Sequence, residues 1–158
     1  MPTILPATPA DAATILAIQK RAFAEEARRC DDWEIPPLTE PVEAVVGHIE
    51  TATVLTARDG TQILGSIRGL VAGEVCTIRA LSIEPGHQGA GIGSALLAAI
   101  EHAHPHVARF ELLTNNAMQD NVRFYQRHGY RVVELLPHSD RIVLAAMHKD
   151  GVVHRKPV

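Results

Sequence analysis

Apolar residues change their spacing along the chain, and these changes predict where its helices and strands lie. Over residues 11–29 and 41–50 the apolar side chains recur at helical intervals. Between residues 53 and 83, short β-branched and aliphatic runs alternate with turn residues, which predicts three consecutive strands joined by hairpins. The rest of the pattern predicts a short strand at 3–5, helices over 92–104 and 119–128, and strands over 107–114, 130–136 and 140–148.

Three local signals sharpen this outline. The segment Thr8-Pro9-Ala10-Asp11 is typical of a helix start, because Thr8 can cap, Pro9 suits the first helical position and Asp11 lies three residues after the cap. Residues 30–41 hold three prolines, and because proline stops a regular helix we expect a loop there. Gly129 is expected to end the preceding helix in the left-handed conformation.

The predicted order of elements is β-α-α-β-β-β-α-β-α-β-β. Three antiparallel strands followed by two strand-helix-strand crossings predict an α+β fold with a mixed sheet and helices on both faces. A chain of 158 residues suits one domain. We expect that domain to span residues 1–150, with residues 151–158 as a flexible C-terminal tail.

Composition narrows the classes of function. Apolar residues make up 46% and charged residues 21%, which is ordinary for a soluble globular protein and argues against disorder. The net charge of −3 disfavours a nucleic-acid partner held by bulk charge. Cys30 and Cys76 form no C-x-x-C pair, which excludes a zinc ribbon or a disulfide framework. Since the sequence shows no basic leader and no apolar run of membrane length, we expect a cytoplasmic protein without a membrane partner.

The sharpest motif is a strand that ends at Ile83 and runs into a glycine-rich turn and a helix, with Gly86, Gly89, Gly91 and Gly93 close together. A helix N-terminus offers unpaired N–H groups and a partial positive charge, and glycines let an anion come close to the backbone. The segment therefore predicts a phosphate or pyrophosphate site. The alternative is a tight strand-to-helix connection in which the glycines serve packing.

Two nucleotide-binding motifs fit this segment less well. A P-loop ends in Gly-Lys-Ser/Thr, and no lysine follows Gly93. A dinucleotide fingerprint from Gly89 needs glycine or alanine where Ser94 stands, although Glu111 lies near the distance expected of a ribose-binding acid. The antiparallel strands upstream argue against it, because a dinucleotide unit normally opens with strand-helix-strand. A dinucleotide-dependent enzyme is one hypothesis that stays open.

The segment Gln88-Gly89-Ala90-Gly91-Ile92-Gly93 resembles the Gln/Arg-x-x-Gly-x-Gly/Ala signature of the GNAT family of N-acetyltransferases. Residues 81–85 resemble the strand that precedes this loop in the family, residues 121–130 resemble its later helix-to-strand segment, and residues 7–13 resemble its opening. The likeness covers nearly the whole chain in the family's order. It implies a GNAT-like, mostly antiparallel sheet with helices on both faces.

The resemblance implies an acetyl-CoA-dependent N-acetyltransferase, which moves an acetyl group to a primary amine by direct attack in a ternary complex. It implies that N–H groups of residues 88–94 hold the CoA pyrophosphate, while the strand around Leu81 pairs with the pantetheine arm and splays from the strand containing Leu112. Asn121 is either a CoA contact or an ordinary polar residue of a first helical turn. The implied cofactor-binding residues are Leu81, Ser82, Ile83, Gln88, Gly89, Ala90, Gly91, Ile92, Gly93, Ser94 and Asn121.

By the same resemblance, Tyr125 matches the catalytic acid that protonates the departing thiolate. A phenol with a pKa of about 10 is protonated at neutral pH and can donate. A backbone N–H on the strand near Leu81 would stabilise the oxyanion. Without the resemblance, Tyr125 is more typical of an ordinary aromatic side chain on an amphipathic helix.

The chain departs from the family where a base is expected. Many relatives carry a glutamate four residues before the Leu81 position, and this chain has Thr77 there; Met118 and Asn121 stand where many relatives have asparagine and alanine. This departure motivates a second hypothesis, a non-catalytic module that binds CoA or another phosphorylated metabolite. The remaining candidates for the base, besides a chain of water molecules, are Glu34, Glu40 and Glu74.

The acceptor is expected to be a small molecule or a peptide carrying an amine. Acidic residues are dense between 25 and 43, a region that borders the acceptor cleft in the GNAT fold, and we hypothesise that some attract a cationic amine. A solvated acidic face is the alternative. His102, His104 and His106 fit a frayed helix end better than a metal site, so no metal is expected. The resemblance also makes a homodimer one expectation, while the oligomeric state is left open.

Overall fold

The computed structural model describes residues 2–152, which form seven strands and five α-helices. The elements are β1 (Thr3–Pro6), the 3-10 helix η1 (Pro9–Asp11), α1 (Ala12–Cys30), α2 (Pro36–Thr39), α3 (Val42–Thr51), β2 (Thr53–Asp59), β3 (Gln62–Ala72), β4 (Val75–Ile83), α4 (Ile92–Ala103), β5 (Arg109–Asn115), α5 (Gln119–Arg127), β6 (Arg131–Pro137) and β7 (Val143–Asp150).

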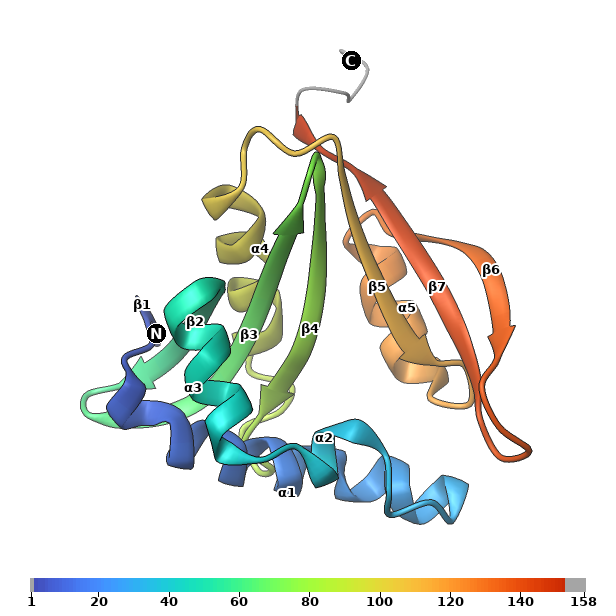
Figure 1. Cartoon of the computed structure of the whole chain (residues 1–158), viewed down its shortest axis with the longest axis horizontal. Coiled ribbons are helices and arrows are strands. Elements are labelled where there is room, and N and C mark those ends of the chain that lie inside the picture. The colour runs from blue at the N-terminus through green and yellow to red at the C-terminus, as the bar shows by residue number, and fades with distance from the viewer. Residues whose placement is uncertain (1, 153–158) are drawn as a thin grey trace.

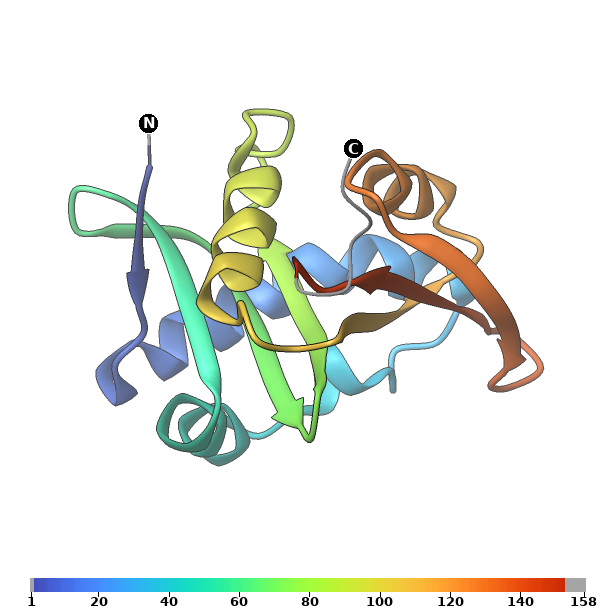
Figure 2. The same cartoon turned by 90° about the horizontal axis from the view of Figure 1, so that it is seen from above.

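The strands form one sheet in the order β1-β2-β3-β4-β5-β7-β6, in which β4 and β5 are parallel and every other pair is antiparallel. Helices α1 and α3 lie on one face, while α4 and α5 lie on the other (Figures 1 and 2). The predicted α+β class, with a mostly antiparallel sheet and helices on both faces, is confirmed.

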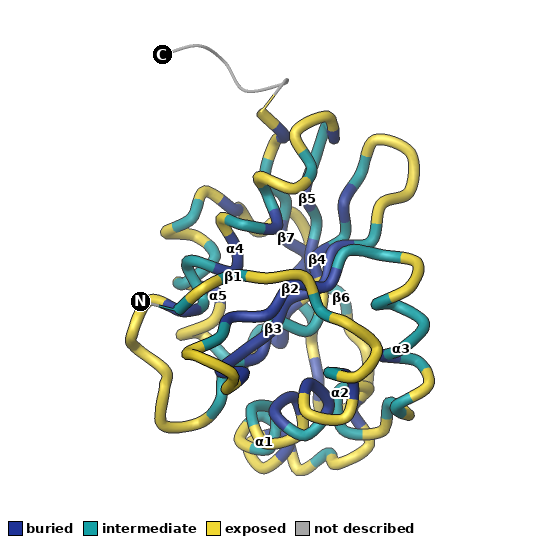
Figure 3. The backbone as a smooth tube through the Cα atoms, turned by 90° about the vertical axis from the view of Figure 1, so that its left-hand side faces the viewer, coloured by how far each residue is buried: buried dark blue, intermediate teal, exposed yellow. Residues whose placement is uncertain are grey.

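Two apolar clusters hold the layers together. The larger joins the sheet to α4 and α5, with Ile67, Leu96 and Phe110 fully buried. The smaller joins α1 and α3 to the sheet through Ile15 and Val45. The central strands β2 and β3 are the most continuously buried part of the described chain (Figure 3). A buried apolar side chain contributes roughly 1.5–3 kcal/mol, so these strands form a rigid base for what lies beside them.

The parallel pair β4 and β5 stays together over a short distance only. Its register pairs are Val75 with Arg109, Cys76 with Phe110 and Thr77 with Glu111. Beyond Thr77, β4 remains on β3 and β5 remains on β7, and the two strands separate into a V whose open end faces α1 (Figure 1). Ala80 has a φ of 54°, and the register with β3 shifts here, which marks a bulge in β4.

Local signals fared differently along the chain. The helix start predicted at Thr8 is confirmed, because the Asp11 carboxylate accepts from the Thr8 backbone N–H at 2.8 Å and so forms a capping box. Gly129 has the expected positive φ, at 91°. The loop expected over 30–41 is wrong in part, since Pro36–Thr39 forms the short helix α2. Its two prolines occupy the first turn, where a missing N–H costs nothing.

At the C-terminal side, the last strand begins at Val143 rather than 140. The turn before it is closed by the His138 N–H, which donates to the Ile142 carbonyl at 3.0 Å. Gly151 is buried, with its N–H on the Ala108 carbonyl at 2.7 Å. The tail expected over 151–158 falls mostly outside the described residues, and the domain boundary at 150 stays a prediction.

Candidate functional site

A cleft of about 980 Å³ passes through the V between β4 and β5 and takes its lining from both faces of the sheet. We call its two parts the glycine-loop half and the α1 half. The glycine-loop half is lined by Leu81, Ile83, Gln88, Gly89, Gly91, Ile92, Gly93, Ser94, Asn121, Phe124 and Tyr125, with His87 and Arg127 beside them. The α1 half is lined by Gln19, Phe23, Glu26, Glu40, His48, Arg68, Thr77 and Arg79, among others.

The glycine loop has the backbone geometry that its sequence predicts. Gly86, Gly89 and Gly91 have φ values of 94°, 82° and 81°, a region that favours glycine. Gly91 is the N-cap of α4, so the unpaired N–H groups of the first turn lie at the cleft. A Cβ placed on any of these three glycines would meet nothing within 4 Å. The loop therefore borders open space and fits an anionic group such as a pyrophosphate.

Helix α5 packs closely on the start of α4. A Cβ on Gly93 would lie 3.4 Å from the Phe124 ring. His128, at the end of α5, lies with its Nε2 3.0 Å from the Ser94 Oγ, and its ring centroid is 4.8 Å from that of Phe124. These contacts fix the first turn of α4 against α5.

The structure brings most of the predicted site residues together in one cleft. Leu81, Ile83, Asn121 and Tyr125 line it with the glycine loop. Ser82 does not, since it is buried and its hydroxyl donates to the Ala80 carbonyl at 3.1 Å. Ala90 is exposed and also lies outside the lining. No contact to a bound molecule tests these assignments, so their cofactor roles stay predictions.

Tyr125 lies where α5 faces both the cleft and the core. Its ring makes edge contacts with Phe124 and Tyr130, at centroid distances of 5.2 and 5.8 Å. Burial raises the pKa of the Tyr125 hydroxyl above its ordinary value. The phenol is therefore fully protonated at neutral pH and able to donate a proton into the cleft.

The position of Glu111 weakens the dinucleotide hypothesis. Glu111 pairs in register with Thr77, which lies six residues before the end of β4, and six residues of strand span roughly 20 Å. In a dinucleotide fold the ribose-binding acid follows the end of the neighbouring strand, beside the glycine loop. Here the Glu111 carboxylate instead pairs with Arg109 and lies 3.2 Å from the His148 Nε2.

The α1 half is built around a buried arginine. The Arg68 guanidinium donates to both oxygens of Glu40, at 2.8 and 2.9 Å, and to Gln19 Oε1 at 2.7 Å. Its Nη1 also lies 3.0 Å from the His48 Nδ1. The Arg68 side chain is 3% exposed, and its Nε–H has no partner among residues 2–152.

The pKa values in this network follow from its charges. Burial alone would raise the pKa of Glu40, but hydrogen bonds and charge from Arg68 outweigh burial and hold that pKa below its ordinary value. Burial lowers the pKa of His48, and the charges of Arg68 and Arg79 lower it further against the opposing charge of Glu40. Glu40 is thus a fixed carboxylate and His48 a neutral imidazole at pH 7.

The three carboxylates considered as bases lie poorly for that role. Glu34 is exposed and Glu74 lies in the β3–β4 turn, and neither lines the cleft. Glu40 lines it but is held by Arg68. Glu26 of α1 lines the cleft. It belongs to the acidic region between residues 25 and 43 and was not among the predicted bases. Burial raises the pKa of Glu26, and a side-chain hydrogen bond with Asn115 lowers it by less.

A pattern in the sequence points to Glu26. Gln19 and Glu26 are seven residues apart on α1, on the same stripe as the buried Ile15 and Cys30. Polar side chains on the buried stripe of a helix are unusual and mark a place where a partner or a cleft must satisfy them.

Two possible features, a metal site and a membrane-spanning helix, are absent from the described part of the chain. Within residues 2–152, no group of three histidine, cysteine or acidic side chains lies close enough to hold a metal ion. In the same range, no helix combines the length and the apolarity needed to cross a membrane.

Comparison with known proteins adds a family and a set of similar structures. A family model described as the acetyltransferase (GNAT) domain matches residues 50–132, more than half of the chain. A Bacillus subtilis protein described as uncharacterized, YdhI, is 32% identical over 80 residues, which cover 49% of each chain. The match thus spans about half the length of this curated relative.

Two solved structures share the fold over almost their whole length. The PaiA N-acetyltransferase of Thermoplasma acidophilum, solved in complex with coenzyme A, matches with a TM-score of 0.78 at 15% identity, over 95% of this chain and 99% of that one. YncA of Salmonella typhimurium, solved with its cofactor acetyl-CoA, matches with a TM-score of 0.77 at 17% identity, over 100% and 98% of the two chains.

Proposed function

The chain belongs to the GNAT acetyltransferase family, and on this premise we propose that it transfers the acetyl group of acetyl-CoA to a primary amine by direct attack in a ternary complex. The observation that carries the proposal is the cleft through the V of β4 and β5, because it brings an anion-binding loop, an open strand edge and a protonated tyrosine into one space. Tyr125, Leu81 and the glycine loop are its main parts.

For acetyl-CoA, the proposal assigns the pyrophosphate to the N–H groups of residues 88–94 at the start of α4. The open edge of β4 beyond Thr77 offers backbone groups around Leu81 and Ile83 to the pantetheine arm, in the manner of an added strand. The acceptor then enters from the α1 half, so that the two substrates meet where the strands separate.

In the reaction, the amine nitrogen forms a bond to the thioester carbon and the carbon–sulfur bond breaks. A backbone N–H at the β4 bulge stabilises the charge that develops on the carbonyl oxygen. The proton of the amine passes to Glu26, whose raised pKa makes it a stronger base than an ordinary glutamate. The thiolate takes a proton from the Tyr125 hydroxyl.

Calorimetric titration with acetyl-CoA, CoA and NAD tests the cofactor assignment first. We expect acetyl-CoA and CoA to bind and NAD not to bind. Release of CoA from acetyl-CoA is then followed with a thiol reagent across a panel of amines. Absence of CoA binding would contradict the proposal as a whole.

Thr77, at the position where many relatives carry a glutamate as the base, favours the second candidate function. In that case the protein binds CoA or a related phosphorylated metabolite as a sensor. Acetyl-CoA binding without turnover of any amine would support this module over the enzyme.

A further inference from the structure

Two arginines lie opposite each other where the strands β3 and β4 line the α1 half, a surface that we call the floor. Arg68 of β3 and Arg79 of β4 are register partners, and both line the cleft. Directly opposite side chains on one sheet face have their Cβ atoms roughly 5 Å apart, and like charges in this arrangement repel each other. Such a pair persists where something else offsets the repulsion.

The charge of Arg68 is accounted for. Glu40 binds it through both carboxylate oxygens, and Gln19 accepts a further hydrogen bond. The Arg68 side chain is also only 3% exposed, so it offers no free face to a ligand. It holds the floor in place and neutralises one carboxylate.

The charge of Arg79 is not accounted for in residues 2–152. Arg79 is exposed, and no acidic side chain of the described chain pairs with it. Its charge nevertheless acts on a neighbouring group of the floor, since it lowers the pKa of His48. With His48 neutral and Glu40 cancelling Arg68, the floor carries one net positive charge that faces the cleft.

The carboxylates of α1, on the opposite wall of the cleft, also differ in whether they have an ion-pair partner. Glu25 is ion-paired with Arg28 and Arg29, at 2.6 and 3.0 Å. Glu26 lines the cleft, and no cation among the described residues pairs with it. Among residues 2–152, the α1 half thus contains one carboxylate without a cationic partner, Glu26, and one guanidinium without an anionic partner, Arg79, whereas Arg28 and Arg29 share the single carboxylate of Glu25. The other unpaired guanidinium of the cleft, Arg127, lies at the end of α5 in the glycine-loop half.

We propose that the acceptor is a free α-amino acid, whose carboxylate binds Arg79 and whose amine faces Glu26. This inference rests on the acetyltransferase function proposed above and names its substrate class. A guanidinium presents a planar pair of N–H donors that matches a carboxylate. A zwitterion satisfies both unpaired groups at once, whereas a simple polyamine would place a further positive charge beside Arg79.

The positions along β4 agree with this assignment. Arg79 lies two residues before Leu81, or roughly 7 Å along a strand, and an arginine side chain is long enough to span most of that distance. The amine of an α-amino acid lies only two bonds from its carboxylate carbon. An amino acid held at its carboxylate by Arg79 therefore brings its amine near the bulge at Ala80, where the thioester is placed by the proposed function.

Matched pairs of acceptors test the proposal. Initial rates are measured with free amino acids and with the corresponding amino acid amides, which keep the amine and lose the carboxylate charge. We expect kcat/KM to favour the free acids by about 10- to 100-fold, the range that a charged hydrogen-bond pair contributes. In Arg79→Gln this preference is lost, because KM for the acids rises by a similar factor while the amides are used as before. Arg79→Lys restores part of the preference.

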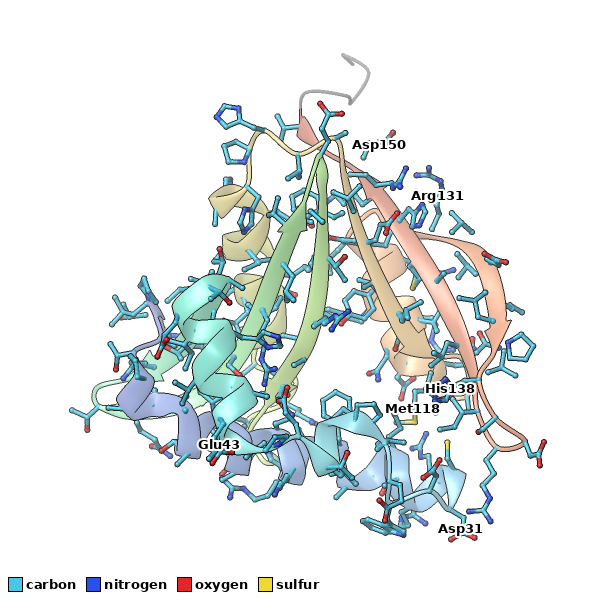
Figure 4. The ribbon with its side chains drawn as sticks, viewed as in Figure 1. Asp31, Glu43, Met118, Arg131, His138 and Asp150 are labelled. Carbon is cyan, nitrogen blue, oxygen red and sulfur yellow. The ribbon has the colours of Figure 1, made fainter. Side chains whose placement is uncertain are left out.

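Arg131→Gln is the control substitution. Arg131 is an exposed arginine at the start of β6, on the side of the molecule away from α1 (Figure 4). It should leave the preference unchanged. Equal use of acids and amides by the native protein would overturn the proposal, and so would better use of peptides than of free amino acids. A loss of activity in Arg79→Gln that is equal for acids and amides would show a structural role and contradict it too.

A binding experiment separates this inference from the proposed function. Amino acids and their amides are titrated into the protein saturated with CoA and into the protein alone. Binding of the acids, lost in Arg79→Gln, supports the inference even if no turnover is seen. If acetyl-CoA binds and simple amines are acetylated while no free amino acid binds or reacts, the proposed function stands and the inference fails.

Discussion

The two halves of the cleft are built from different parts of the chain in different ways. The glycine-loop half takes most of its lining from one continuous segment, residues 81–94, which offers mainly backbone N–H groups, and the rest from α5. The α1 half takes polar and charged side chains from α1, α3, β3, β4 and the segment before α3, which meet only in the folded protein. Chain geometry therefore governs the first half, and the balance of buried charge governs the second.

The largest effect is expected from breaking the charge balance at Arg68. In Arg68→Met, Glu40 loses its cation and Gln19 loses a hydrogen-bond donor, both in poorly solvated positions. Removing one partner of a buried ion pair costs about 3–5 kcal/mol, so we expect the free energy of unfolding in urea to fall by this amount. Acetyl-CoA affinity of the variant that remains folded should change little, because the glycine-loop half is not touched.

Arg21→Met is the matched control. The Arg21 guanidinium also binds a carboxylate through two hydrogen bonds, to Glu84 at 2.9 and 3.0 Å, but its side chain is 52% exposed. Exposed pairs contribute about 0–1 kcal/mol, and the loss should stay in that range. Equal losses in the two variants would show that burial does not set the strength of the Arg68 network. The double variant Arg68→Met with Glu40→Leu should regain part of the loss.

The next effect is expected from Tyr125, which lines the glycine-loop half. Tyr125→Phe removes the proposed proton donor and keeps the ring contacts with Phe124 and Tyr130. General acids contribute roughly 10²–10⁴-fold, and we expect kcat at pH 7 to fall at least 100-fold. The dissociation constant of acetyl-CoA, measured by calorimetry, should stay within about threefold of the native value.

Tyr130→Phe provides the comparison. The Tyr130 hydroxyl donates to the Glu101 carboxylate at 2.8 Å, inside the core and away from the cleft lining. This variant should lose about 1–2 kcal/mol of stability and keep kcat within a few-fold. A similar drop in kcat for both variants would assign the effect to the core rather than to proton donation.

Glu26 and Glu25 are neighbours with opposite electrostatics. The pKa of Glu26 is raised by burial, whereas hydrogen bonds from Arg28 and Arg29 lower the pKa of Glu25 to about 2. In Glu26→Gln we expect kcat/KM at pH 7 to fall by about 100-fold, with loss of the acid limb of the pH profile. Glu25→Gln should leave both unchanged, and a pH profile of Glu26→Gln that keeps its acid limb would exclude Glu26 as the base.

The free energy of unfolding of Glu26→Gln, compared with that of the native protein, is expected to depend on pH. A raised pKa means that the folded protein favours the protonated carboxyl, so the contribution of Glu26 to stability is present at low pH and is lost as pH rises through its folded pKa. The glutamine variant should therefore be more stable than the native protein at pH 7. Near pH 4, close to the ordinary glutamate pKa, the difference should shrink. Thermal unfolding at the two pH values measures it.

Local sequence predicted the glycine-loop half and much of the fold. The hairpins, the loop glycines and the stop at Gly129 depend on conformations that nearby residues impose, and the structure has them. The short helix α2 was missed because proline is unfavourable inside a helix but not in its first turn.

The α1 half was not predictable in the same way. Arg68 lies in the strand β3, which is buried without interruption from residue 63 to 69, and no nearby residue in the sequence indicates its contacts with Gln19 and Glu40, which lie 49 and 28 residues away. Such contacts follow from how strands and helices pack, and only the seven-residue spacing of Gln19 and Glu26 on α1 gave a local hint.

The smallest effect sharpens the comparison most directly, because it uses one substitution at two glycines. Gly91 and Gly60 have φ values of 81° and 61°, and a Cβ on either meets nothing within 4 Å. Alanine in this conformation costs about 1 kcal/mol at each site. Gly91→Ala should also weaken acetyl-CoA binding by about tenfold, since relaxing this strain turns the first N–H groups of α4 away from the anion.

Gly60→Ala, in the β2–β3 hairpin, should lose the same stability and no affinity. Calorimetry with acetyl-CoA and urea unfolding of both variants give the two numbers. Equal stability with unequal affinity would mean that the conformation of residue 91 acts on the ligand through the backbone alone. Unchanged affinity in Gly91→Ala would mean that the loop binds by side chains or by space, and the contrast between a backbone half and a side-chain half of the cleft would then fail.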